Sequence, residues 1–291
     1  MRAADPRRLL KRYNLRPRRS LGQNFLVNQA APAQIVAGAE VGPDDAVLEV
    51  GAGLGTLTAE LAAQAGRVIA VETDPHLVAA LRDMLGTQGN VEIVHGDILT
   101  LDPASLLAVS PPPHPSLWGS RLENYVVVAN LPYYITGAVI RHILEAPVRP
   151  ARMVVTVQRE VAQRIVAVPG KMSLLAVSVQ FYGRPRVLLR LKRGAFYPVP
   201  AVESAVLRLD LYESPPVDAP DVAFFFRVVR AGFAQRRKQL RNTLSATLQL
   251  SPPEVAAALT AVDVASTRRA ETLSLEEWGR VAGALQPLLA F

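Results

Sequence analysis

Hydrophobic and polar positions change their spacing repeatedly from Asp45 onward, and these changes predict strands that alternate with helices. Apolar runs predict strands at 46–50, 67–71, 91–94, 125–129, 153–157, 187–191 and 206–211. Apolar residues at helical spacing predict helices at 56–65, 75–85 and 136–145. This alternation is typical of an α/β domain in which helices cover both faces of a mostly parallel sheet.

The pattern changes again after Ser214-Pro215-Pro216, where the strands stop and only helical segments follow. Two of these segments begin with the serine and glutamate of a capping box, at Ser251–Glu254 and Ser274–Glu277. We therefore expect a basic arm at 1–19, an α/β domain at 20–214 and a small all-α domain at 215–291. A proline-rich stretch at 110–120 is interpreted as an insertion of unassigned function.

Composition narrows the classes of protein to which this chain can belong. Of its 291 residues half are hydrophobic, the formal net charge is +7, and no cysteine is present. A sizeable core and a polyanionic partner are indicated, and disulfides and thiolate chemistry are excluded. The four histidines lack metal-ligand spacing, so no metal is predicted. No apolar run approaches the ~18 residues of a membrane helix, and no secretory leader is visible, so we expect a cytoplasmic protein without a membrane partner.

Positive charge gathers in two segments of the chain. Residues 1–19 hold eight Arg and Lys against one Asp, which fits either a solvated tail or an arm that binds phosphate. The second segment is expected to form one helix and contains no acidic residue. A solvated helix normally mixes in Glu and Asp, so this composition favours phosphate binding. Its basic residues are Arg227, Arg230, Arg236, Arg237, Lys238 and Arg241.

A glycine-rich loop, Glu49-Val50-Gly51-Ala52-Gly53-Leu54-Gly55, joins the first predicted α/β strand to its helix. Glycines let the backbone turn sharply and let a ligand approach closely, although a purely structural turn would also use them. Glu72 and Asp97 end the next two strands. Carboxylates at those positions can accept hydrogen bonds from ribose hydroxyls and from an adenine amine. Together these residues indicate a cofactor that contains a nucleoside.

Two cofactors compete for this loop. A dinucleotide such as NAD usually requires Gly-x-Gly-x-x-Gly beneath its diphosphate, and here the third glycine arrives one position early. Glu49 is expected to place negative charge beside the loop, which would repel a diphosphate. S-Adenosylmethionine carries a sulfonium and an ammonium group and no phosphate. It is therefore favoured over NAD.

The tetrad Asn130-Leu131-Pro132-Tyr133 follows the predicted strand 125–129 and so belongs at the carboxyl edge of the sheet. The Asn130 amide oxygen and the Leu131 carbonyl can accept the hydrogens of an adenine amine. Pro132 fixes the turn, and the Tyr133 ring can stack on the purine. A strand-ending turn without function is the simpler alternative. Tyr134 fits either a second wall for the base or a core position.

Several motifs, taken in order, resemble those of the small-subunit branch of the ribosomal RNA adenine dimethyltransferases. They are Leu21-Gly22-Gln23-Asn24-Phe25-Leu26, Glu49-x-Gly51-x-Gly53, Glu72, Gly96-Asp97, Asn130–Tyr133, Gln158-Arg159-Glu160, Phe196-x-Pro198-x-Pro200-x-Val202-x-Ser204 and Phe233-x-Gln235-Arg236-Arg237-Lys238-x-Leu240-Arg241-Asn242. The resemblance extends from about Arg18 to the end of the chain. It implies a Rossmann-like S-adenosylmethionine-dependent methyltransferase fold at 20–214 and a helical RNA-binding domain at 215–291.

The resemblance also implies a reaction and the residues that perform it. The reaction is N6,N6-dimethylation of two adjacent adenosines in the 3′-terminal hairpin of small-subunit rRNA. We expect the partner to be small-subunit rRNA or the immature small ribosomal subunit, and the protein to be a monomer. Phe196 is a candidate second stacking face for the target base, and a packed core aromatic is the alternative. Expected catalytic residues are Asn130, Leu131, Pro132 and Tyr133; expected cofactor contacts are Asn24, Leu26, Gly51, Gly53, Glu72, Asp97 and Asn130; expected RNA contacts are Phe196, Arg236, Arg237, Lys238 and Arg241.

Three other functions stay open at this point. Large-subunit adenine methyltransferases of the macrolide-resistance type share the fold and chemistry but usually have isoleucine before the proline, where this chain has Leu131. A non-catalytic ribosome assembly factor could keep the pocket, although it would not need the intact tetrad. An NAD-dependent dehydrogenase is the third alternative.

Overall fold

The structure is a computed structural model that describes residues 5–108, 120–218 and 221–289. The predicted insertion at 110–120 lies outside the described residues, apart from residue 120. The chain divides into two compact units. The first combines most of the chain up to residue 162 with 185–211, and the second combines 163–184 with the chain from 212 onward. The segment 163–184, assigned from its sequence to the α/β domain, thus groups with the C-terminal helices.

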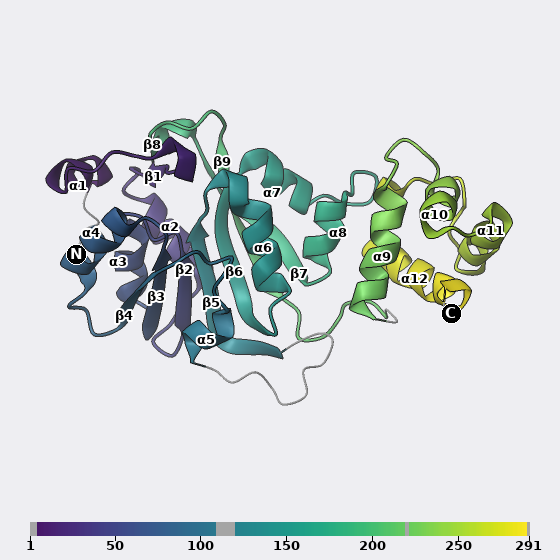
Figure 1. Ribbon diagram of the computed structural model, residues 1–291, viewed down its shortest axis with the longest axis horizontal. Helices are drawn as coiled ribbons and strands as arrows, with labels where there is room; N and C mark the ends of the chain where they lie inside the picture. The colour runs from purple at the N-terminus through teal and green to yellow at the C-terminus, as the bar shows by residue number, and fades with distance from the viewer. Residues whose placement is uncertain (1–4, 109–119, 219–220, 290–291) are drawn as a thin grey trace. The chain divides into compact units, whose positions relative to one another are not determined.

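The elements follow in chain order (Figure 1). The first unit contains α1 (Pro6–Arg12), η1 (Arg19–Leu21), β1 (Phe25–Leu26), α2 (Ala31–Ala39), β2 (Ala46–Val50), α3 (Thr56–Ala62), β3 (Arg67–Glu72), α4 (Pro75–Leu85), β4 (Val91–His95), α5 (Pro103–Leu107), β5 (Ser120–Asn130), η2 (Tyr133–Ile135), α6 (Thr136–Leu144), β6 (Val148–Gln158), η3 (Arg193–Ala195), β8 (Phe196–Tyr197) and β9 (Ser204–Leu211). Helix α7 (Arg159–Ile165) and strand β7 (Gly183–Leu191) belong partly to each unit. The second unit contains α8 (Leu174–Gln180), α9 (Val222–Phe233), α10 (Leu240–Leu248), α11 (Pro252–Ala261), η4 (Ala270–Thr272) and α12 (Leu275–Leu289).

A seven-stranded sheet has the order β4-β3-β2-β5-β6-β9-β7. Parallel pairs join β2 to β3 and β5, β3 to β4, and β5 to β6, whereas β9 runs antiparallel to β6. The predicted strands are all present, several of them longer than expected, and the mostly parallel sheet is confirmed. The strand order reverses between β2 and β5. In open α/β sheets, ligands bind beyond the carboxyl ends of the strands at such a reversal.

Helices cover both faces of this sheet, as predicted. On one face Ile35 of α2 and Leu57 and Leu61 of α3 pack in one cluster with Val47 of β2 and Val126 of β5. Helix α6 lies on the opposite face (Figure 1). Because the central strands are buried on both sides, they read as continuous apolar runs rather than as alternating ones.

The basic arm contains a helix that the hydrophobic pattern did not predict. Residues 6–12 form α1, which begins after the N-cap Asp5. Its Leu9 and Leu10 are buried. The solvated-tail interpretation is therefore wrong for this segment, because the two leucines hold it against the α/β unit.

The second unit is helical around an aromatic cluster. Phe181 stacks on Phe225 with ring centroids 4.5 Å apart, and Phe226 meets Phe181 edge-on at 5.0 Å. Both predicted capping boxes are confirmed. The Glu254 carboxylate accepts from the Ser251 N–H at 3.0 Å while the Ser251 hydroxyl accepts from the Glu254 N–H. The same reciprocal pair joins residues 274 and 277.

The basic segment of this unit does not form the single helix that was expected. Helix α9 ends at Phe233, residues 236–238 lie in the following turn, and Arg241 belongs to α10. The chain turns because Leu240 is fully buried, and its N–H donates to the Arg268 carbonyl at 2.7 Å. Tertiary packing therefore overrides the local helical pattern. The predicted helix at 56–65 also ends early, at Ala62.

Gly232 gives a test of packing in the helical unit. A Cβ built on it would lie 2.3 Å from the fully buried Trp278 ring. We expect Gly232→Ala to lower the free energy of unfolding by about 1–3 kcal/mol through overpacking, measured by urea denaturation. Gly283→Ala is the matched control, because a Cβ there meets nothing within 4 Å, and it should raise stability by up to ~1 kcal/mol. Equal effects of the two substitutions would contradict this packing.

Candidate active site

The loop between β2 and α3 has three glycines in a backbone conformation that favours glycine, and Gly51 and Gly53 are the two that line the cavity described below. Gly51 and Gly53 have φ angles of 74° and 59°, in the left-handed region. At Gly53 a Cβ would also lie 3.3 Å from the Phe25 ring. The loop therefore presents bare backbone to whatever occupies the space beside it.

The strand register brings the predicted site residues to one edge of the sheet. Val50 pairs with Val71 of β3 on one side and with Ala129 of β5 on the other. The next positions along these strands are Gly51, Glu72 and Asn130. Since neighbouring strands lie about 4.8 Å apart, the glycine loop, the carboxylate and the asparagine are adjacent.

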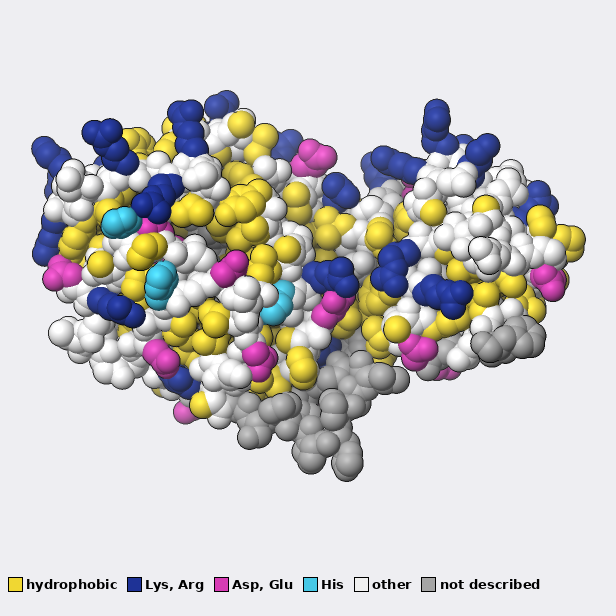
Figure 2. All heavy atoms as spheres, viewed as in Figure 1, with side chains coloured by type: hydrophobic (Ala, Val, Ile, Leu, Met, Phe, Trp, Pro, Cys, Tyr) yellow, Lys and Arg dark blue, Asp and Glu magenta, His cyan; other side chains and the backbone are white. Residues whose placement is uncertain are grey.

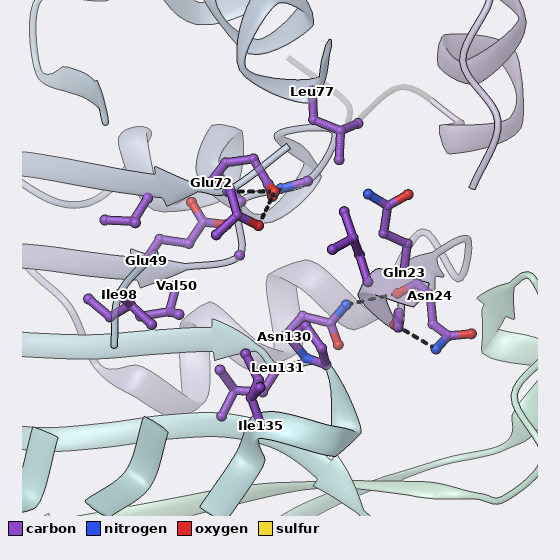
Figure 3. A pocket seen from close by; sticks show the side chains of 18 of the residues that line it. Gln23, Asn24, Glu49, Val50, Glu72, Leu77, Ile98, Asn130, Leu131 and Ile135 are labelled. Carbon is purple, nitrogen blue, oxygen red and sulfur yellow. Dashed lines mark hydrogen bonds between the residues drawn. The ribbon is translucent and has the colours of Figure 1, made fainter. Parts of the chain in front are cut away.

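A cavity of about 450 Å³ opens at this edge. That volume lies within the ~300–1,000 Å³ usual for small-molecule sites. Figure 3 shows Glu72 and Asn130 reaching it from different strands. All the residues expected to bind the cofactor or act in catalysis line this cavity, namely Asn24, Leu26, Gly51, Gly53, Glu72, Asp97, Asn130, Leu131, Pro132 and Tyr133.

The Glu72 carboxylate is held in one orientation by the backbone. It accepts hydrogen bonds from the N–H groups of Gly53 at 2.9 Å, Thr73 at 2.8 Å and Asp74 at 2.9 Å. The Thr73 hydroxyl adds a longer contact of 3.4 Å to Oε1, the oxygen that also accepts from Thr73 and Asp74. Among the described residues Oε2 accepts only from Gly53, so it keeps acceptor capacity for a hydroxyl of a bound ligand. This geometry fits the ribose of an adenosine-containing cofactor.

Asn130 is oriented by the segment that contains Asn24. Its Nδ2 donates to the Asn24 backbone carbonyl at 3.0 Å, and the Asn24 Nδ2 donates to the Gly22 carbonyl at 3.0 Å (Figure 3). Because the Asn130 amide nitrogen is engaged, its Oδ1 is the atom left to accept from a ligand. The Leu131 carbonyl also accepts no hydrogen bond from a described residue. The cavity thus has two neighbouring acceptors for one amine.

The two tyrosines of this turn differ in environment. The Tyr133 hydroxyl shares a 2.6 Å hydrogen bond with the Oγ of Ser204, which is fully buried at the start of β9. Burial raises the pKa of the Tyr133 hydroxyl, so it stays protonated and the bond fixes the ring. Tyr134 is 64% exposed, which excludes the core position proposed as one alternative for it.

Glu49 does not carry the charge that was expected of it. The residue is 1% exposed. Burial raises the pKa of its carboxyl to about 8, and the neighbouring Glu72 carboxylate adds to the rise. Glu49 is therefore mostly protonated at neutral pH, because desolvation of the charged form outweighs its contacts. The preference for a cationic cofactor then depends on Glu72, Asp97 and the glycine spacing.

The expected RNA contacts lie outside the cavity. Phe196 is 1% exposed and packs in the same core cluster as Leu26, which supports the core-aromatic alternative over a stacking face. The cationic residues Arg236, Arg237 and Lys238 are exposed in the second unit. Arg236 lies 3.8 Å from the Glu271 carboxylate of η4. The basic segment has no acidic residue in its own sequence, but the fold brings this one next to it.

Several cavity residues were not identified from the sequence. Phe25, Leu77 and Ile98 supply apolar wall. Ile98 directly follows Asp97, and Leu77 lies in the first helical turn after the Asp74 N-cap. Both residues come shortly after the end of a strand, and that position in the sequence could have identified them as cavity residues. No group of three or more His, Asp or Glu in the described residues could hold a metal ion. Nor is any helix in the described ranges long and apolar enough to cross a membrane.

Comparisons with known proteins agree with this geometry. The family model described as ribosomal RNA adenine dimethylase matches residues 14–286. The chain belongs to this family. It is a methyltransferase with the Rossmann-like fold that its motifs predicted, and S-adenosylmethionine is the cofactor that its cavity residues fit.

Curated relatives cover nearly the whole chain. A protein named ribosomal RNA small subunit methyltransferase A from Dehalococcoides mccartyi is 44% identical over 94% of this chain and 90% of its own length. Its namesake from Moorella thermoacetica is 44% identical over 96% of both chains.

Two solved structures share the architecture. The 23S rRNA methyltransferase ErmE is similar with a TM-score of 0.70 and 29% identity, over 90% of this chain and 99% of that one. A dimethyladenosine transferase from Plasmodium falciparum has a TM-score of 0.74 and 20% identity, over 90% of this chain and 98% of that one, and supports the fold.

The buried Glu49 predicts an unusual pH dependence of stability. In the unfolded chain its carboxyl ionises near 4.5, whereas the folded chain keeps the proton until about pH 8. Between these values the folded state binds more protons, so stability is lost as pH rises. Relative to Glu49→Gln, the wild-type free energy of unfolding should fall by roughly 2–4 kcal/mol from pH 5 to pH 8, measured by urea denaturation. Parallel curves for the two proteins would contradict a buried, protonated Glu49.

Proposed function

We propose that this protein transfers methyl groups from S-adenosylmethionine to N6 of two adjacent adenosines in the 3′-terminal hairpin of small-subunit rRNA, giving dimethyladenosines. The observation that carries the proposal is the orientation of Asn130. Its amide nitrogen is bound to the Asn24 carbonyl, which leaves its Oδ1 free to accept, and the next residue, Leu131, also lines the cavity with its carbonyl unused among the described residues. Two acceptors on adjacent residues suit an exocyclic amine with two hydrogens.

Bound S-adenosylmethionine would supply a methyl group to the adenine N6. As the nitrogen–carbon bond forms, the carbon–sulfur bond would break, S-adenosylhomocysteine would leave, and the methylated amine would release its proton to water. The adenine amine is a weak nucleophile because its lone pair is delocalised into the ring. Asn130 Oδ1 and the Leu131 carbonyl, by accepting its hydrogens, favour a pyramidal nitrogen whose lone pair is free for attack. Positioning and fixed dipoles of this kind can supply several kcal/mol without a general base.

The other cavity residues would bind the target adenine or the cofactor. The Tyr133 ring, fixed through Ser204, would stack on the flipped adenine, a contact worth about 1–3 kcal/mol. Glu72 would bind ribose hydroxyls, and Asp97 would accept from the adenine amine of the cofactor. Asn24, Leu26, Gly51 and Gly53 would form the remaining wall, which agrees with their place in the cavity.

The small subunit is the better supported substrate. Relatives named for it are 42–44% identical over most of this chain, whereas the 23S enzyme is 29% identical. We infer further that the immature small ribosomal subunit is bound, in the cytoplasm, by a monomer. All residues that line the cavity lie between 21 and 135 of one chain, which supports a site complete without a second copy.

The helical unit is proposed to bind the rRNA backbone. Arg236, Arg237 and Lys238 are exposed on the turn between α9 and α10, and Arg241 follows in α10. Exposed arginine and lysine side chains neutralise phosphates without reading the base sequence, so they would hold the RNA rather than select the adenosine.

Asn130→Ala tests the proposed chemistry. We expect kcat/KM to fall about 100-fold or more, as when one electrostatic contact to a reacting group is removed. The readout is mass spectrometry of dimethyladenosine in small-subunit rRNA after incubation with enzyme and S-adenosylmethionine. Asn124→Ala is the matched control on the same strand, exposed and outside the cavity, and should dimethylate normally. Full activity of Asn130→Ala would refute the assigned role, and an inactive wild type would favour the assembly-factor alternative.

Replacing Arg236, Arg237 and Lys238 with Gln tests the RNA surface. Each duplex phosphate contact contributes about 0.9 to the slope of log affinity against log salt, so the slope should flatten by up to ~2.7. Filter binding to immature small subunits from 50 to 200 mM KCl measures it. Affinity for S-adenosylhomocysteine should not change, because these side chains lie outside the cavity. An unaltered salt slope would remove the turn from the RNA interface.

A further inference from the structure

We infer that helix α1 is a phosphate-binding part of the RNA site, fixed beside the cofactor cavity with a basic face turned to solvent. The inference rests on the proposed function for the identity of the RNA. It goes beyond that function by assigning RNA contacts to residues 7–12 of the first unit.

The helix is anchored on the back of the cavity wall. Leu9 and Leu10 are 7% and 5% exposed and pack in one cluster with Phe25, Leu54 and Leu77. The last three residues also line the cavity. One layer of side chains therefore separates α1 from the cofactor space.

Polar contacts hold both ends of the same segment. The Asp5 carboxylate accepts from the Arg7 N–H at 2.9 Å and caps the helix. Just beyond its C-terminus, the Tyr13 hydroxyl donates to the Asp83 carboxylate of α4 at 2.5 Å, and Arg12 lies 3.6 Å from the same carboxylate. These contacts fix the direction in which the opposite face of the helix points.

That opposite face is basic throughout. Arg7, Arg8, Lys11 and Arg12 are all exposed and recur at the three- and four-residue spacing of one helix side. Figure 2 shows Lys and Arg side chains gathered at the edge of the first unit where Figure 1 places α1. Among the described residues no ion pair is formed by Arg8 or Lys11.

Only Lys11 and Arg12 lie in the last turn of the helix, where its dipole favours cations. Arg7 and Lys11, like Arg8 and Arg12, are like charges four residues apart, which repel. Arg7 and Arg8 also occupy the first turn, where the helix dipole favours acids, and no acid is present there. Anchoring is already provided by the two leucines. A polyanion outside the helix would relieve both repulsions.

An exposed aromatic ring lies next to this basic face. Tyr197 of β8 pairs with Phe25 of β1, so the two side chains share one face of the ribbon. Tyr197 is 38% exposed, and the Arg7 guanidinium lies 5.4 Å from its ring centroid. Cations for phosphates beside a ring for a base match RNA with unpaired nucleotides, rather than a lipid surface.

The test compares Arg8→Gln/Lys11→Gln with Arg141→Gln/Arg190→Gln, which removes two exposed cations from α6 and β7. Binding of a 3′-hairpin rRNA fragment is measured by fluorescence anisotropy from 50 to 200 mM KCl. The α1 variant should lose about 1.8 from the slope of log affinity against log salt, at about 0.9 per contact. The control should lose less than half of that, and S-adenosylhomocysteine affinity should stay at the wild-type value in both.

A second variant, Leu9→Ala/Leu10→Ala, keeps every charge but removes the anchor. It should lose the same part of the salt slope, because the cations are no longer held in place. A wild-type slope in this variant would overturn the docked helix in favour of a tail that binds loosely.

The outcomes separate this inference from the proposed function. Normal dimethylation by the wild type, with an unchanged slope in Arg8→Gln/Lys11→Gln, overturns the role of α1 alone. A wild type that binds the hairpin but does not methylate it overturns the proposed reaction. In that case the salt slopes of the α1 variants still show whether α1 binds phosphates. Loss of binding to anionic phospholipid vesicles but not to the hairpin in the α1 variant would assign the face to a membrane and overturn the inference.

Discussion

The hydrogen bond between the Asn130 amide nitrogen and the Asn24 carbonyl is the contact on which the rest of the site depends. It spans 3.0 Å and joins residues 106 positions apart in the chain. Without it, the amide could present either its nitrogen or its oxygen to the cavity. With it, the end of β5 offers an acceptor beside the Leu131 carbonyl. The register of β5 on β2 then brings this acceptor next to the glycine loop and Glu72.

Charge is distributed differently inside and outside the first unit. The cavity holds Glu72, whose carboxylate is satisfied by three backbone N–H groups, and a buried Glu49 that burial keeps protonated. The outer face of α1 is basic. The carboxylates of Glu72 and Asp97 in the cavity suit a cationic donor, and the basic groups outside suit RNA. One small domain can thus bind two ligands of opposite charge because protein and solvent separate them.

Aromatic side chains show how burial divides structural from functional roles. Phe196 and Tyr197 are neighbours in β8, yet the first is 1% and the second 38% exposed. Alternation along a strand sends one ring into the core and leaves the other at the surface. In η2 no strand alternation applies: Tyr133 lines the cavity with its hydroxyl held by Ser204, whereas Tyr134 is 64% exposed. Which of two adjacent rings can meet a base is decided by the packing behind them.

The sequence by itself determined the mostly parallel α/β sheet, the helical C-terminal region, the family and ten of the residues that line the cavity, among them Gly53, Glu72 and Asn130. These follow from local signals: the period of apolar residues, the positions where strands end, and glycines at turns. Only the tertiary structure decided that Glu49 is protonated, that Phe196 belongs to the core and that α1 docks on Phe25. Desolvation and packing depend on neighbours distant in the chain, so no local pattern could specify them.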